Sequence, residues 1–165
     1  MKKIQVKIIA LISVSIIVLL FSGCESKTVP AKNNDEFDID DFEAAMKDKG
    51  YDFEIIDVNK DFLPAVRKRM INDDMAIDIY VFDSEEEAER EAGFIDEGGS
   101  SYDNGRKAVH VSWISYPHFF KKGCLIVQYV GEDTGIVNDL EDILGEQFAG
   151  YIQLPVEQHR QCIVP

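Results

Sequence analysis

The chain has 165 residues, of which 17 are basic and 31 are acidic, so its formal net charge at pH 7 is −14. A protein this acidic repels phosphate backbones and anionic lipid headgroups, which argues against nucleic-acid binding and against a basic membrane-binding patch. The sequence contains no internal repeat or low-complexity segment, and its length predicts one folded domain.

The first 23 residues have the three parts of an export signal. In order, these are the basic residues Lys2, Lys3 and Lys7, the apolar run 8–21, and the small residues Ser22 and Gly23. The apolar run has 14 residues, whereas a helix needs roughly 20 to cross a bilayer. We therefore expect a cleaved signal peptide over 1–23; an uncleaved anchor or an ordinary secretory signal is the alternative.

The junction Leu20-Phe21-Ser22-Gly23-Cys24 resembles the lipobox of bacterial lipoproteins, although Phe21 stands where that motif usually has leucine. The resemblance implies cleavage before Cys24 and a diacylglyceryl thioether on its sulfur. Because one acyl chain binds a bilayer only marginally, a lipid with two or three chains is needed for residence. We therefore expect a cell-envelope protein anchored to the cell membrane through the lipid on Cys24, facing the extracytoplasmic side.

The chain from Cys24 onward divides into three parts by composition. Residues 24–36 are mostly polar, which predicts a flexible tether. Apolar residues recur regularly over 37–152, which predicts a single domain, and 153–165 remain as a C-terminal tail. Without the three lysines of the signal, the chain from Cys24 has a net charge of −17.

In the first half of the domain, apolar periodicity predicts two helices and three strands. These are a helix over 38–49, strands over 51–55, within 62–71 and over 75–82, and a helix from Ser84 to Gly98. Asp38 can cap the first helix and Gly50 can end it. Ser84 and Glu87 have the spacing of a capping box, which predicts the start of the second helix.

The sequence of the second half of the domain predicts a loop, further strands and a last helix. These are a surface loop over 98–107, a strand over 109–113, a hairpin that turns at Lys122-Gly123, and a helix over 134–144. The loop is rich in Gly, Ser, Asp and Asn. The hairpin joins Phe119 and Phe120 to the alternating segment 124–130, and Gly145 ends the helix.

Hairpins with short connections imply an antiparallel sheet, and helices with one apolar face imply packing on that sheet. The sequence therefore predicts an α+β fold in two layers. We expect a mainly antiparallel sheet of about five strands and about three helices. Their order is α-β-β-β-α-β-β-α.

Two motifs resemble those of a family of small, uncharacterised bacterial lipoproteins. One is the aromatic hairpin from Trp113 through Pro117-His118-Phe119-Phe120-Lys121-Lys122-Gly123, and the other is the ending Leu144-Gly145-Glu146-Gln147-Phe148-Ala149-Gly150. The resemblance covers the last third of the domain closely and the middle loosely. It supports the expected fold and location, and it implies no activity.

The cysteines and histidines offer one weak catalytic hypothesis. His118 and Cys124 could act as a base and a thiol nucleophile, yet a lone strand cysteine is usually a small buried hydrophobe. With Cys24 expected to carry the lipid, two cysteines remain, Cys124 and Cys162. A disulfide between them is possible in an oxidising compartment. Because Cys162 lies in the tail, two unpaired thiols are favoured.

No motif predicts a metal, cofactor or nucleotide. His110 and His118 lack the spacing of paired metal ligands, and the acidic runs 35–41 and 85–87 lack the features of a calcium loop. The glycines at 131 and 135 flank Glu132-Asp133, which would repel a phosphate. We therefore expect no bound cofactor, and the acidic runs are expected to be solvated surface.

Five ring-bearing side chains cluster around a proline. They are Trp113, Tyr116, His118, Phe119 and Phe120. Because one face of a strand cannot bury both phenylalanines, alternation predicts that some rings are exposed and form a contact site for a cell-envelope protein, a sugar chain or the membrane interface. The alternative is that a helix or the tail covers them. The leading hypothesis is a non-enzymatic binding module of unknown ligand; the runner-up is an extracytoplasmic hydrolase or thiol enzyme that uses His118 and Cys124.

Overall fold

The structure, a computed structural model, describes residues 36–152. The expected signal peptide over 1–23, the lipidated Cys24, the tail over 153–165 and Cys162 lie outside the described residues. So does the expected tether 24–36, apart from Glu36. In the described part of the chain, no helix has the length and apolar character needed to cross a membrane.

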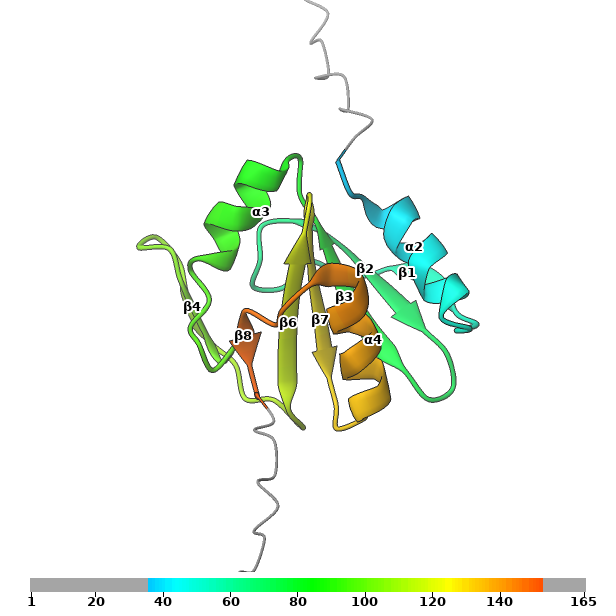
Figure 1. The fold of residues 1–165 in the computed structure, drawn as a ribbon. Helices are drawn as coiled ribbons and strands as arrows, with labels where there is room; N and C mark the ends of the chain where they lie inside the picture. The colour runs from blue at the N-terminus through cyan, green and yellow to red at the C-terminus, as the bar shows by residue number, and fades with distance from the viewer. Residues whose placement is uncertain (1–35, 153–165) are drawn as a thin grey trace, which may run out of the picture. The chain divides into compact units, whose positions relative to one another are not determined.

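The domain consists of three helices and two sheets (Figure 1). The elements are α2 (Ile39–Asp48), β1 (Glu54–Asp57), β2 (Val66–Ile71), β3 (Ala76–Val81), α3 (Glu85–Ala92), β4 (Ser101–Asp103), β5 (Ala108–His110), β6 (Pro117–Lys122), β7 (Leu125–Val130), α4 (Thr134–Leu144) and β8 (Ala149–Gly150). The main sheet is antiparallel with the strand order β1-β2-β3-β7-β6-β8, and β4 and β5 form a separate two-stranded sheet. The predicted α+β class is confirmed.

Each helix begins where a side chain caps the amide groups that have no partner within the helix. The Asp38 carboxylate accepts hydrogen bonds from the amides of Asp40 and Asp41 at the start of α2. The Ser84 hydroxyl accepts from the amide of Glu87 at the start of α3. Asp133 caps α4 in the same way. The polar first turns thus fix where the apolar helix faces meet the sheet.

Helices cover both faces of the main sheet, so the sheet is the middle of three layers. On one face, α2 and α4 pack on residues such as Ile77, Val127 and Phe120, which form the first core. On the other face, α3 and the β4–β5 sheet pack on Tyr80, Phe119 and their neighbours, which form the second core. The fold therefore extends the predicted arrangement by one covered face.

The segment 98–107 differs from its prediction as a surface loop. Part of it is β4, which pairs with β5, and the Tyr102 hydroxyl donates a 2.6 Å hydrogen bond to the buried carboxylate of Glu91 in α3. The second helix also ends earlier than predicted: α3 stops at Ala92, and Ile95 instead forms a β-bridge with Tyr102. The burial of Tyr102 explains why part of this segment forms a strand. No alternation pattern in the sequence predicts that burial.

The chain joins and leaves the domain at opposite ends of β6. At the start, the carbonyl of Phe37 accepts a hydrogen bond from the amide of Cys124, in the β6–β7 turn, and Glu36 accepts one from the amide of Glu85. At the end, the amide of Tyr151 donates a 2.7 Å hydrogen bond to the carbonyl of Pro117, the first residue of β6. Figure 1 shows these two points at opposite ends of the sheet.

Candidate functional site

The structure divides the five ring-bearing residues of the predicted contact site into two groups. Phe119 and Phe120 are fully buried and His118 is almost so, whereas Tyr116 is exposed and Trp113 is half-buried. The prediction that some of the five rings are exposed is confirmed by Tyr116. The reason given for it, that the strand cannot bury both phenylalanines, is wrong. It assumed that only one face of the sheet is covered.

Each phenylalanine belongs to a different core. The Phe119 ring lies in the second core, with its centroid 6.2 Å from that of Trp113 and 6.4 Å from that of Phe62, both in edge-on contacts. Phe120 lies in the first core, between the sheet and the helices α2 and α4. Trp113 also donates a hydrogen bond from Nε1 to the carbonyl of Gly99. These three rings therefore stabilise the fold and do not present a contact surface.

An exposed apolar surface remains where the chain leaves the domain. We call it the aromatic surface, and it comprises Ile114, Tyr116, Tyr151 and Ile152. The rings of Tyr116 and Tyr151 are stacked, with centroids 4.0 Å apart and an interplanar angle of 16°. Tyr116 is 44% exposed, Tyr151 42%, Ile152 65%, and Ile114 is fully exposed.

Hydrogen bonds to their backbone carbonyls hold the two stacked tyrosines in place. The carbonyl of Tyr116 accepts from the amide of Gly131 (3.0 Å), and the carbonyl of Tyr151 accepts from the side-chain amide of Gln147 (3.0 Å). His118 lies behind them: its Nε2 is 3.2 Å from the carbonyl oxygen of Gly131 and its Nδ1 is 2.7 Å from Oε1 of Gln147. The buried histidine thus links the two segments that carry the tyrosines.

The geometry opposes a catalytic pair made of His118 and Cys124. His118 faces Tyr129 across the β6–β7 hairpin, and Cys124 precedes Tyr129 by five residues. At roughly 3.3 Å per strand residue, the two side chains are about 16 Å apart along the hairpin. Both ring nitrogens of His118 already have partners, and Cys124 is buried with its Sγ 3.8 Å from the carbonyl of Phe37. A thiol and a base at this separation cannot exchange a proton directly.

The remaining histidine, His110, and the acidic side chains do not form a metal site in the described part of the chain. His110 is exposed in β5, away from His118 in β6. Within residues 36–152, no group of three or more His, Cys, Asp or Glu side chains has an arrangement that could hold a metal ion.

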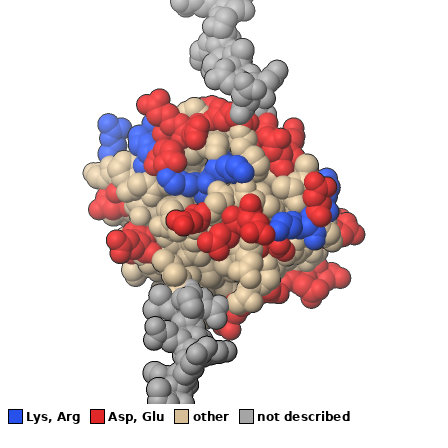
Figure 2. Space-filling view, viewed as in Figure 1, with Lys and Arg blue, Asp and Glu red and all other residues tan. Residues whose placement is uncertain are grey.

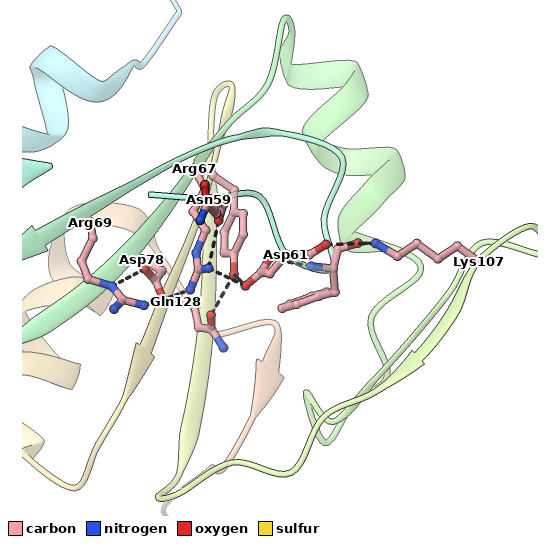
Figure 3. A network of polar contacts seen from close by, with 9 residues as sticks. Asn59, Asp61, Arg67, Arg69, Asp78, Lys107 and Gln128 are labelled. Carbon is pink, nitrogen blue, oxygen red and sulfur yellow. Dashed lines mark hydrogen bonds and ion pairs between the residues drawn. The ribbon is translucent and has the colours of Figure 1, made fainter. Parts of the chain in front are cut away.

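A network of charged side chains lies on the face of the sheet that carries the second core, and Figure 3 shows it from close by. Arg67 and Arg69 of β2 both bind Asp78 of β3: Nη2 of Arg67 is 2.8 Å from Oδ2, and Nε of Arg69 is 2.7 Å from Oδ1. Burial alone would lower the pKa of Arg67, but its hydrogen bond to Asp78 and the nearby negative charges outweigh burial and raise that pKa. The arginine therefore stays charged.

Tyr80 extends this network into the core. Its hydroxyl is 3.0 Å from the Asp61 carboxylate and 3.1 Å from Oε1 of Gln128, which is only 2% exposed. A hydroxyl has one proton, so it cannot donate to both oxygens. Reversing the side-chain amide of Gln128 resolves the conflict, because Nε2, which has no other partner in the described part of the chain, then donates to Tyr80. Burial, and after it the charge of Asp61, raises the pKa of Tyr80, so the phenol stays neutral.

The network connects segments that are distant in the sequence. Nη1 of Arg67 donates to the carbonyl of Asn59, and Nζ of Lys107 donates to the carbonyls of Asp61 and Phe62. It thus fastens the β1–β2 connection and the β4–β5 turn to the sheet. No role was predicted for these residues from the sequence, although two arginines at alternate positions of one strand and an aspartate in the next strand were the signal that could have found them.

Comparisons with protein-family models, with curated proteins and with solved structures found no match to this chain. The resemblance to a lipoprotein family therefore stays a prediction from the sequence. Of the two clusters described above, the charged network pairs Arg67 and Arg69 with Asp61 and Asp78, whereas the aromatic surface is open to solvent. The aromatic surface is the better candidate for a functional site.

Proposed function

We propose that this chain is a lipid-anchored, extracytoplasmic binding module that contacts a cell-envelope protein through the aromatic surface. The observation that carries the proposal is the exposed stack of Tyr116 on Tyr151. Isolated exposed apolar residues are ordinary in a soluble domain. Two stacked tyrosines, each with an exposed isoleucine one or two positions away in the chain, have the composition of a protein contact, since aromatic residues are enriched in such interfaces.

The stack is also suited to binding because it is already ordered. Each tyrosine is held through its backbone carbonyl, by Gly131 in one case and by Gln147 in the other. A partner that packs on these rings does not need to order them first, and a lower ordering cost leaves more of the contact energy as affinity. Rigid aromatic side chains are typical binding hot spots for this reason.

The position of the aromatic surface supports a partner in the envelope. If Cys24 carries the lipid, the tether joins the domain at Phe37, and the aromatic surface lies at the other end of β6. Thirteen residues, 24–36, span at most about 45 Å when extended, which is enough to hold the domain clear of the headgroups. The surface is then accessible to a protein above the membrane.

The test is site-specific photo-crosslinking in cells that express the full chain. A photo-reactive residue replaces Tyr116 in one variant and Glu86, an exposed residue of α3, in the control. We expect one discrete cross-linked protein from position 116 and none from position 86. Identical products from both positions, or none from position 116, would refute the proposal.

The anchor has a separate test. We expect mass spectrometry of the N-terminal peptide to show a diacylglyceryl group on Cys24. A Cys24→Ser variant should move from the membrane fraction to the soluble fraction. Retention of that variant in the membrane would show that the anchor is a peptide segment and not a lipid.

A further inference from the structure

Three glutamates occupy backbone positions next to the aromatic surface. Glu132 follows Gly131, whose amide donates to the carbonyl of Tyr116, and Glu146 precedes Gln147, which donates to the carbonyl of Tyr151. The carbonyl of Glu97 accepts from the amide of Gly150, the residue before Tyr151. All three glutamates are exposed, and none forms an ion pair within residues 36–152.

Basic side chains are absent from the same region of the described chain. The segments that build or adjoin the aromatic surface contain no lysine or arginine; they are 93–101, 110–117, 130–135 and 145–152. In Figure 2 the blue side chains lie in the upper half and at the right, and the side chains that are visible around the grey atoms in the lower part are red or tan. The nearest lysines in β6, Lys121 and Lys122, are at the other end of that strand, where they bind Glu89 and the carbonyl of Ile143.

From this distribution we infer that the partner of the aromatic surface is a basic polypeptide segment in which lysine or arginine side chains alternate with apolar ones. The inference rests on the proposed function. The exposed faces of Tyr116 and Tyr151 attract a cation through their π electrons, and the flanking glutamates add Coulomb attraction that speeds the encounter. The two isoleucines offer contacts for the apolar side chains of such a segment.

The same charges disfavour an anionic lipid surface as the occupant. Exposed tyrosines and isoleucines would suit the headgroup region of a bilayer. Each of the three glutamates, however, would be repelled by anionic headgroups, and no lysine or arginine of the described segments is placed to offset that repulsion.

The test uses the full chain in non-ionic detergent and two labelled probe peptides. One peptide alternates leucine with lysine, and in the other serine replaces every lysine. Binding is followed by the anisotropy of the label, and by the fluorescence of Trp113, the single tryptophan of the chain. We expect the lysine peptide to bind at least about tenfold more tightly than the serine peptide, and Tyr116→Ser to weaken its binding about tenfold.

A pair of charge variants separates a local effect from the general acidity of the protein. Glu132→Gln and Glu86→Gln remove the same charge, but only Glu132 is next to the aromatic surface. We expect Glu132→Gln to weaken the lysine peptide about two- to fivefold and Glu86→Gln to leave it unchanged. Equal effects of the two variants would overturn the inference, because the attraction would then be non-specific.

Two further outcomes distinguish this inference from the proposed function. If the serine peptide binds as tightly as the lysine peptide and depends on Tyr116, the aromatic surface is a contact site but its partner is not basic. If neither peptide depends on Tyr116, the inference of a basic segment fails, and photo-crosslinking from position 116 decides the proposed function separately. If brominated lipids quench the fluorescence of Trp113 in vesicles that contain the full chain, the occupant of the aromatic surface is a lipid surface. The inference of a basic segment would then be wrong.

Discussion

Phe119 and Phe120 are consecutive residues of β6, and their rings are fully buried in different cores on opposite faces of the sheet. Successive strand side chains point to opposite faces, so this arrangement needs a cover on both. The cover consists of α2 and α4 on the side of Phe120, and of α3 with the β4–β5 sheet on the side of Phe119. Strand β6 therefore contributes a fully buried ring to each of the two cores.

Replacing either phenylalanine with alanine should strongly destabilise the domain. We expect Phe119→Ala and Phe120→Ala each to lower the free energy of unfolding by about 3–5 kcal/mol, since a fully buried ring leaves a cavity. Tyr116→Ala is the matched control and should cost less than about 1 kcal/mol. Urea denaturation followed by circular dichroism measures all three. A small loss for Phe119→Ala would mean that its ring is not part of the second core.

Breaking the Arg67–Asp78–Arg69 network should cost more than breaking an exposed ion pair. We expect Asp78→Asn to lower the free energy of unfolding by about 3 kcal/mol, because it leaves the largely buried Arg67 without its main counter-charge. Asp57→Asn removes the partner of Lys68, but the Asp57 side chain is 83% exposed, so its cost should stay below about 1 kcal/mol. Equal losses for the two variants, again from urea midpoints, would contradict a structural role for the network.

The stability of the domain should fall at alkaline pH through Tyr102. Burial, together with the hydrogen bond to Glu91, raises the pKa of Tyr102 to about 12, whereas a tyrosine in the unfolded chain ionises near pH 10. Between these values the unfolded chain binds fewer protons than the folded one. The free energy of unfolding therefore falls as pH rises, by about 1.4 kcal/mol per pH unit for this group.

Tyr102→Phe isolates that contribution. The variant should lose less stability than the original chain between about pH 10 and pH 12, and the difference should grow by about 1.4 kcal/mol per unit. Urea unfolding at a series of pH values measures it. Parallel pH profiles for the two chains would show that Tyr102 ionises equally readily in the folded state.

Cys124 should react slowly with alkylating reagents in the folded protein. The side chain is buried, and its sulfur lies 3.8 Å from the carbonyl of Phe37, so a reagent reaches it only when the β6–β7 turn opens. In a Cys162→Ser background, we expect alkylation at least about tenfold slower than in denaturing urea. Fast alkylation of the folded chain would revive the thiol-enzyme hypothesis.

The sequence predicted those elements whose signals are local. Gly145 was predicted to end the last helix, and the observed α4, Thr134–Leu144, agrees with the predicted 134–144. The turn at Lys122-Gly123 was also predicted correctly, and Gly123 has a positive φ of 53° with the carbonyl of Phe37 packed against it. A side chain at that position would clash with the Phe37 backbone, so glycine is required by a contact as well as by the turn.

The parts that the sequence did not predict depend on contacts between distant segments. Strand β8 has two residues and pairs with β6 only through His118 and Phe119, which is too short for an alternation pattern. Which of the rings near Pro117 are exposed could not be predicted, because it depends on whether α3 and the β4–β5 sheet cover Phe119. Tyr151, the partner of Tyr116 in the stack, lies 35 positions later in the chain, and no periodicity relates two residues at that separation.

The positions at which the chain joins and leaves the domain also determine how it would carry a mechanical load. If the expected tether and the proposed partner exist, a pull through the tether would act at Phe37, at the turn end of the β6–β7 hairpin, and a pull from a protein bound at Tyr116 would act at the opposite end of β6. Such a force runs along the strands. The hydrogen bonds of an antiparallel pair lie across the strands, so they would be loaded together in shear and not opened one after another. A domain held at these two points would resist tension better than one held by both ends of a single hairpin.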